Sequence, residues 1–287
     1  MTAVLTGPEK LVKAKRGKRS VLVGISLVIV GLVILCALFQ QFITPYPAGE
    51  QNLSDALAGP SLSHLLGTDD LGRDVFSRII VGARSALIGP AIIAFGAMLI
   101  GTLLGLTAGY LGGWYQMLVM RWVDLMFAVP QLLIAIVVVG VLQGTYWEAV
   151  LVLIVLTAPA DTRLLRGATV AQRNLPYVEA LRVVGVPTRR ILAGHVWPTL
   201  LPLTVAQTFL NFATSIVTLA SLSFLGLGVA PGAADWGRML AEGRDLVVVN
   251  PWTAIGPGLA IALTAASMNI VGDWLLEQLS SRGKARA

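Results

Sequence analysis

Long apolar runs make up most of the chain, and short segments between them carry nearly all of the charged residues. A helix needs about 20 apolar residues to cross the hydrocarbon core of a bilayer. On that criterion the pattern predicts an all-α, polytopic membrane protein with six transmembrane helices. These run approximately from Val21 to Phe42, Leu87 to Ala108, Met117 to Leu142, Trp147 to Leu165, Leu200 to Leu227 and Trp252 to Leu276.

The composition agrees with this pattern. Of 287 residues, 56% are hydrophobic and 13% are charged, whereas a soluble domain carries about 25% charged residues. The first run follows a basic segment, as a secretion signal does, but the apolar core of a signal extends only about 7–15 residues. This run is longer and ends in Phe39-Gln40-Gln41-Phe42. We interpret it as a retained transmembrane helix.

The distribution of Lys and Arg predicts the orientation in the membrane. Most of the 21 basic residues lie in segment 1–20, around the polar segment 166–198, and in the tail 280–287. Positive segments stay in the cytoplasm, so both termini are expected there. Segment 43–86 is expected on the opposite, extracytoplasmic side. The basic residues flank apolar runs without interleaved aromatic residues, which argues against a nucleic-acid partner.

Segment 66–78, after the first run, has the pattern of a capped amphipathic helix. Thr68 is a suitable N-cap, and two acid–base pairs, Asp69/Arg73 and Asp74/Arg78, are four residues apart with the acid first. The segment is either an entry helix to the second span or part of a surface that receives a binding protein.

The polar segment between the fourth and fifth spans predicts two short helices. Pro176 suits a first helical turn, and the residues from Tyr177 to Val184 are mostly compatible with a helix. Gly185 can adopt the left-handed conformation that ends a helix, and Pro187 can open the next one. We expect a helix, a glycine elbow and a second helix on the cytoplasmic side.

Polar residues recur in the fifth span at alternating intervals of three and four, which places them on one helical face. They are Thr204, Gln207, Asn211, Thr214, Thr218 and Ser221. Polar side chains at membrane depth face protein or a water-filled cavity. A pathway lining and hydrogen bonds between helices are both compatible with this stripe.

Small residues in the second span predict close helix packing. Gly101, Gly105 and Gly109 are spaced by four residues, a pattern that lets two membrane helices approach closely. Pro90 and Pro130 can kink the helices that contain them.

Acidic residues near the membrane are few. Asp124 lies three residues after Arg121, and Asp161 lies two before Arg163, so ion pairing or snorkelling to the interface explains both. A proton relay would need grouped ionisable residues at mid-membrane, and no such group is evident. This pattern disfavours an ion-coupled secondary transporter.

Sequence motifs for catalysis are absent. The chain has no phosphate loop, no nucleophile elbow and no zinc-protease helix. The predicted topology places His64 and His195 on opposite sides of the membrane, so no metal site is expected. Cys36 is the single cysteine, which excludes an intrachain disulfide. We expect a non-enzymatic chain without a cofactor of its own, whose energy for active transport would enter through a partner.

Two groups of motifs resemble one known family. Glu179-Ala180-Leu181, then Gly185, Ile191 and Pro198, resemble the EAA loop of ABC-importer permeases, with Leu181 in place of the second alanine. Leu66-Gly67-Thr68-Asp69 and the run from Leu71 to Arg78 are similar to the dipeptide, oligopeptide and nickel permeases, C-type subunit. Segments 109–114 and 235–244 extend the resemblance, which runs from about residue 20 to residue 279.

The resemblance implies a five-helix core over residues 87–279 and a bacterial cytoplasmic-membrane location. It implies as partners a B-type permease subunit, an extracytoplasmic binding protein and two cytoplasmic ATPase subunits that bind ATP and Mg. It assigns ATPase coupling to Glu179, Ala180, Gly185, Arg189, Ile191 and Pro198. Candidates for the pathway are Thr204, Gln207, Asn211, Thr214 and Thr218.

The resemblance implies a di- or oligopeptide as the substrate. The alternative substrate is nickel or another small solute, transported by the same mechanism. Two further alternatives from other classes are an ion-coupled secondary transporter and a membrane scaffold that transports nothing.

Overall fold

The computed structural model describes the backbone of residues 8–284 and the side chains of residues 21–280. The predicted basic tails, 1–20 and 280–287, lie wholly or partly outside the described side chains. Within the described part all regular elements are helical, which confirms the all-α fold. The long helices are α1 (Pro8–Ile43), α2 (Val75–Leu111), α5 (Tyr146–Arg173), α8 (Trp197–Phe224) and α10 (Trp252–Lys284). The shorter ones are α3 (Gly113–Phe127), α4 (Gln131–Val141), α6 (Pro176–Val183), α7 (Thr188–Ile191) and α9 (Trp236–Gly243).

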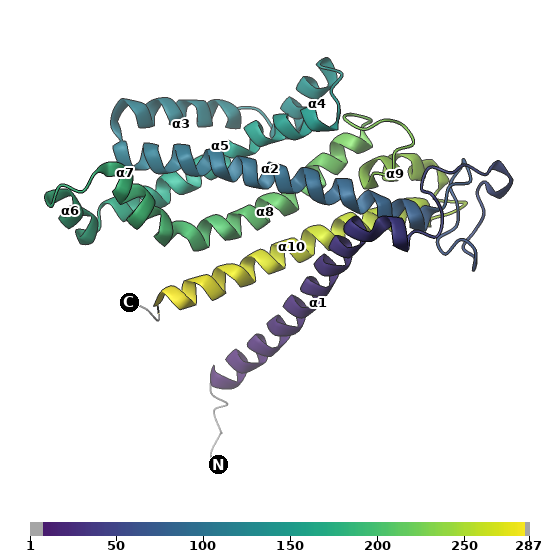
Figure 1. The fold of residues 1–287 in the computed structure, drawn as a ribbon, viewed down its shortest axis with the longest axis horizontal. Helices are drawn as coiled ribbons and strands as arrows, with labels where there is room; N and C mark the ends of the chain where they lie inside the picture. The colour runs from purple at the N-terminus through teal and green to yellow at the C-terminus, as the bar shows by residue number, and fades with distance from the viewer. Residues whose placement is uncertain (1–7, 285–287) are drawn as a thin grey trace, which may run out of the picture.

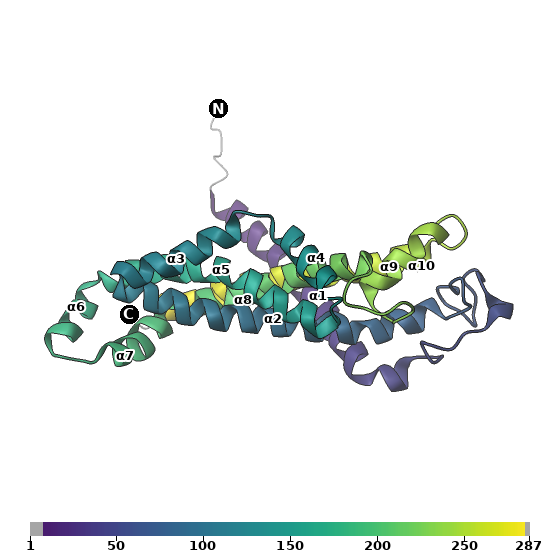
Figure 2. The ribbon, with the colours of Figure 1, turned by 90° about the horizontal axis from the view of Figure 1, so that it is seen from above.

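The helices form an elongated bundle (Figures 1 and 2). Helices α2, α5, α8 and α10 run along its length, with α2 packed on α5 and α8, and α8 packed on α10. The C-terminal part of α1 packs on α10 and α2, whereas its N-terminal part lies away from the bundle. At one end lie α6 and α7, toward which the last residues of α10 point. Helix α9 and segment 44–74 lie at the other end.

Four helices are long and apolar enough to cross a membrane: Val21–Ile43, Val75–Leu111, Thr188–Phe224 and Trp252–Ser280. Helices α3 and α4 together make a fifth candidate if they form one span bent by 82°. The bend falls at Pro130, the residue before α4, where the sequence predicts a kink. Helix α5 covers the remaining predicted span but is not among these candidates, since Asp161, Arg163 and Arg166 interrupt its apolar sequence.

The glycine ridge of α2 packs against α5, as the small-residue spacing predicts. A Cβ atom on Gly101 would lie 2.3 Å from Cβ of Asp161, and one on Gly105 would lie 2.9 Å from the carbonyl oxygen of Thr162. Gly109 approaches the backbone of the same helix one turn further on. The two helices can be this close only because the α2 residues at the contact have no side chain.

Helix α2 begins before the predicted start of the second span, Leu87, but after Thr68, the predicted N-cap of the amphipathic helix. Its first residue is Val75, and a carboxylate oxygen of Asp74 caps it by accepting a hydrogen bond from the Ser77 N–H at 2.8 Å. The expectation of a helix starting at Thr68 is wrong, because Gly72 adopts a φ of +71° and interrupts any helix there. The predicted entry helix is therefore the first turns of α2 itself.

Candidate functional site

Helices α6 and α7 form a compact hairpin at one end of the bundle (Figure 1). Pro176 occupies the first turn of α6, and Gly185 follows the helix with a φ of +82°. The Gly185 N–H donates to the Arg182 carbonyl at 3.0 Å, which closes the end of the helix. Pro187 then precedes α7. The predicted helix, glycine elbow and second helix are confirmed.

One face of the hairpin is fixed to the bundle. A buried cluster joins it to α2 and α8, and consists of Leu106, Tyr110, Val178, Ile191, Val196 and Leu200. Arg182 donates from Nε to the Tyr110 hydroxyl at 3.0 Å, and its guanidinium lies 4.7 Å from the centre of the ring. Arg173, the last residue of α5, donates to the Tyr110 carbonyl at 3.1 Å. These contacts attach the hairpin to α2.

The opposite face of the hairpin is exposed. Five of the six residues assigned to ATPase coupling are on the surface, namely Glu179, Ala180, Gly185, Arg189 and Pro198, whereas Ile191 is buried. Within the described residues, the side chains of Glu179 and Arg189 make no hydrogen bond or ion pair. Val183 and Val184 at the tip are 83% and 80% exposed. The sequence-based reasoning missed these two valines, although adjacent apolar residues at the end of a polar segment were a usable signal.

The polar stripe of α8 divides into two parts. Thr204 and Asn211 are buried, Gln207 and Thr218 are half-buried, and Thr214 is exposed. The threonine hydroxyls donate to carbonyls of their own helix, as Thr218 does to Thr214 at 2.9 Å. The amides of Gln207 and Asn211 instead form a chain, with Gln207 Nε2 donating to Asn211 Oδ1 at 3.1 Å.

That chain ends on Asp161 of α5. Asn211 Nδ2 donates to Asp161 Oδ2 at 2.7 Å, and the Asp161 side chain is fully buried. The expected pairing of Asp161 with Arg163 is wrong, because residues two apart on a helix point in different directions. Arg163 instead donates to Asp124 at 2.6 Å. Asp124 consequently takes a partner on another helix instead of Arg121.

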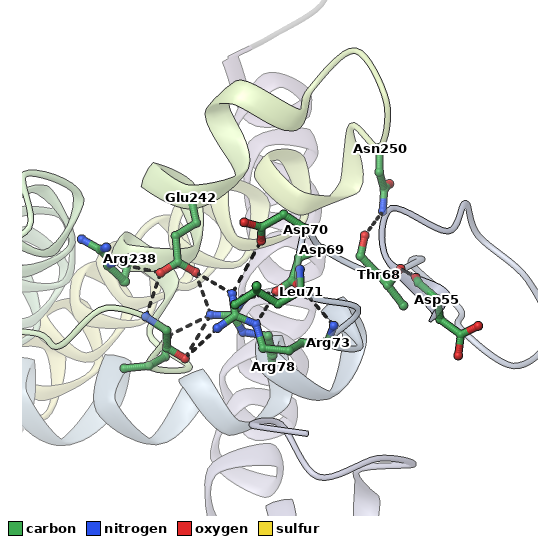
Figure 3. Close-up of polar contacts among 12 residues, drawn as sticks. Asp55, Thr68, Asp69, Asp70, Leu71, Arg73, Arg78, Arg238, Glu242 and Asn250 are labelled. Atoms are coloured by element: carbon green, nitrogen blue, oxygen red, sulfur yellow. Dashed lines mark hydrogen bonds and ion pairs between the residues drawn. The ribbon is translucent and has the colours of Figure 1, made fainter. Parts of the chain in front are cut away.

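A network of charged residues holds the other end of the bundle together (Figure 3). Arg73 Nε donates to Asp69 at 2.7 Å, and Arg78 contacts Asp69 as well. Arg78 Nη2 also reaches Glu242 of α9 at 2.9 Å, and Arg238 Nε lies 3.0 Å from the same carboxylate. Segment 44–74, α2 and α9 are joined here.

Glu242 is the acceptor that connects α9 to this network. Burial raises its pKa, but hydrogen bonds from the Gly232 N–H, at 2.9 Å, and from Arg78 outweigh burial and leave the pKa below its ordinary value. The predicted Asp74/Arg78 pair does not form, since Asp74 caps α2 and contacts His64 at 3.0 Å. Sequence spacing holds no signal for Glu242, which lies 164 residues from Arg78.

Within the described residues, no three His, Cys, Asp or Glu side chains are placed to hold a metal ion. His64 lies in the segment before α2, and His195 lies in the π-helical turn Leu192–Val196 that leads into α8. The two histidines are therefore at opposite ends of the bundle.

Residues 101–284, which include the hairpin, match the family model described as binding-protein-dependent transport system inner membrane component. The chain belongs to this family. Residues 14–60 also match the N-terminal TM domain of oligopeptide transport permease C.

Among the relatives of this permease is the dipeptide transport system permease protein DppC of Alkalihalophilus pseudofirmus. It is 36% identical over 284 residues, which cover 99% of this chain and 92% of the relative. The glutathione transport system permease protein GsiD of Pectobacterium atrosepticum is 40% identical over 255 residues, or 88% of this chain and 85% of the relative. The glutathione transport system permease protein GsiD of Escherichia coli is 40% identical over 254 residues, which cover 88% of this chain and 84% of the relative.

These findings make the protein a permease of an ABC importer and an inner membrane component of its transport system. Family members are generally non-catalytic subunits, and systems of this kind include an ATPase and a binding protein. Because the chain belongs to the family of binding-protein-dependent permeases, the two alternatives from other classes, an ion-coupled secondary transporter and a scaffold, no longer apply.

Proposed function

We propose that this permease imports di- or oligopeptides and that α6 and α7 are the cytoplasmic coupling loop through which ATPase subunits drive it. One observation carries the proposal. The hairpin is attached to α2 on one face. Its other face presents the Glu179 carboxylate, which has no ion-pair partner among the described side chains, and the exposed Val183 and Val184. A surface of this kind suits docking onto a protein outside the lipid.

Each coupling residue has a role in this proposal. Glu179 makes polar contacts in a groove of the ATPase, and Ala180 permits close approach there. Gly185 makes the turn, while Arg189 and the buried Ile191 fix the second helix. Pro198 lies in the first turn of α8, the helix that tilts when the hairpin moves.

The cycle follows from this attachment. ATP closes the ATPase pair, the hairpin moves with it, α5 and α8 tilt, and the transport pathway opens outward. Hydrolysis resets the inward-facing state. Coupling requires that the hairpin bind differently to the two ATPase states, because a ligand shifts an equilibrium only by its differential affinity.

The proposed topology has six spans with both termini in the cytoplasm. It counts α5 as a span and the bent pair of α3 and α4 as another, and it follows the concentration of Lys and Arg near the hairpin and in the terminal segments. The hairpin then faces the cytoplasm of a bacterial cell, and the Glu242 network faces outward. Residues 87–279 form the transport core.

The proposed assembly contains a B-type permease subunit, two cytoplasmic ATPase subunits and an extracytoplasmic binding protein. ATP and Mg are bound by the ATPase subunits, since this chain has no phosphate loop. The bilayer surrounds the complex, and no nucleic acid takes part. Of the five α8 candidates, Gln207, Thr214 and Thr218 have side chains open enough to line the pathway, whereas Thr204 and Asn211 are buried.

Peptides are the proposed substrates because two relatives are named for dipeptide and glutathione transport. The stripe on α8 carries no charge, which suits a pathway that passes variable peptides without binding them tightly. Nickel or another small solute, moved by the same mechanism, is the alternative substrate.

The test is uptake of labelled dipeptides into proteoliposomes that hold this permease with its partner permease, ATPase and binding-protein subunits. Gly185→Pro removes the required positive φ and should abolish ATP-dependent uptake while the permease pair still assembles. Gly194→Ala is the control, because Gly194 has open space and no positive φ. Uptake without ATP would overturn the coupling, and ATP-driven uptake of nickel but not peptide would change the substrate alone.

A further inference from the structure

Helices α5 and α8, which flank the hairpin, share one side-chain hydrogen bond among the described side chains of residues 21–280. It is the 2.7 Å bond from Asn211 Nδ2 to Asp161 Oδ2. The exposed fractions of the two residues are 3% and 0%. The bond joins positions 50 residues apart in the chain and so closes a loop that contains the whole hairpin.

The surroundings hold this bond in one geometry. The backbone of α2 lies directly behind Asp161, where Gly101 leaves room for it. Gln207 Nε2 donates to Asn211 Oδ1 at 3.1 Å and thereby turns the amide nitrogen of Asn211 toward α5. Among the side chains of residues 21–280, Asp161 has no ion-pair partner, and its Oδ1 accepts no hydrogen bond.

This arrangement is not needed for packing alone. Leucine has nearly the shape of Asp or Asn, and replacing both partners of a buried polar pair by apolar residues of similar shape is often neutral. Between membrane helices there is little hydrophobic driving force, so interhelical hydrogen bonds help to determine which helices stay together.

We propose that Asp161 is a positioning residue for transport: through Asn211 it joins α5 to α8, so that a displacement of the hairpin tilts both helices as one body. The bond lies roughly 20 Å from the last residue of α5 and from the first residue of α8, at 1.5 Å per residue. Without this bond, α5 and α8 can separate, and a displacement of the hairpin no longer tilts both helices together. This inference rests on the proposed coupling role of α6 and α7.

The test compares two double variants in the reconstituted importer. Asp161→Leu with Asn211→Leu removes the bond and leaves two apolar side chains of similar shape. Asp161→Asn with Asn211→Asp exchanges the partners, so that the new carboxylate accepts from both residue 161 and Gln207. The readout is peptide taken up per ATP hydrolysed, with assembly of the complex measured alongside.

The leucine pair should assemble and hydrolyse ATP, but uptake per ATP should fall about three- to tenfold, the equilibrium factor supplied by one interhelical hydrogen bond in a membrane. The variant with exchanged partners, Asp161→Asn with Asn211→Asp, should restore the wild-type uptake per ATP. Unchanged uptake per ATP in the leucine pair would overturn the inference, as would an exchanged pair that fails equally. Gly185→Pro in the same assay separates the two proposals: if it uncouples transport while the leucine pair does not, only the role of Asp161 fails.

Discussion

Arg182 and Tyr110 connect the exposed hairpin to the long helix α2. Arg182 Nε donates to the Tyr110 hydroxyl at 3.0 Å, and the guanidinium lies 4.7 Å from the ring centre. The same tyrosine receives, on its carbonyl, a hydrogen bond from Arg173 at the end of α5. One residue of α2 therefore contacts both the hairpin and the helix that leads into it.

Removing the Tyr110 hydroxyl should loosen α6. Tyr110→Phe keeps the ring beneath Arg182 but loses a hydrogen bond to a charged group, worth about 1.5–3 kcal/mol when buried and less at this partly exposed site. We expect faster amide hydrogen exchange in residues 176–184. Tyr115→Phe is the control, because it removes a comparable contact, 3.1 Å from Thr107, on α3. Equal exchange of α6 in both variants would contradict the role of Tyr110.

The valine tip should be needed for ATPase binding. Burying a valine side chain contributes about 1.5–3 kcal/mol, so replacing both Val183 and Val184 by Asp should weaken binding of the ATPase at least about tenfold. Their exposed fractions of 83% and 80% leave the fold itself unaffected. The measurement is the affinity of the solubilised permease pair for its ATPase subunits.

The matched control for the valine tip lies at the other end of the bundle. Val247→Asp with Val248→Asp makes the same change at side chains that are 43% and 97% exposed. ATPase affinity should be unchanged in this variant. An equal loss in both double variants would show a general charge effect and not a docking surface.

The glycine ridge predicts a sharp contrast between two alanine substitutions. Gly101→Ala places a Cβ atom 2.3 Å from that of Asp161 and 3.0 Å from its carbonyl carbon. Relieving that overlap should cost roughly 1–3 kcal/mol of stability and lower Tm in detergent. Gly167→Ala enters open space within α5 and should raise stability by about 0.5–1 kcal/mol. A Tm for Gly101→Ala at or above the wild-type value would refute the close contact.

The Glu242 network predicts an acid-dependent stability. Because the pKa of Glu242 in the folded protein lies below its ordinary value of 4.5, its contribution is complete above that pH and is lost as the pH falls toward the lowered pKa. Glu242→Gln should lower Tm near neutral pH and flatten the decline of Tm on acidification. Asp245→Asn removes an ion pair with Arg244 at a side chain that is 78% exposed, and it should change neither.

Patterns that depend on local spacing were predictable from the chain. The apolar runs indicated the helices, although the charges in α5 leave four or five clear membrane candidates where the pattern predicts six. The elbow at Gly185 and the close approach of Gly101 and Gly105 to α5 both followed from where glycine occurs. Glycine acts through its own backbone and missing side chain, so its position alone is informative.

The sequence by itself therefore determined the helical class, the position of the hairpin and the family. Only the tertiary structure decided the partners of the charged residues: Asp161 bonds Asn211 instead of Arg163, and Arg78 bonds Asp69 and Glu242 instead of pairing with Asp74. The physical reason is distance along the chain. A partner 50 or 164 residues away is brought into reach by the packing of whole helices, which no local spacing encodes.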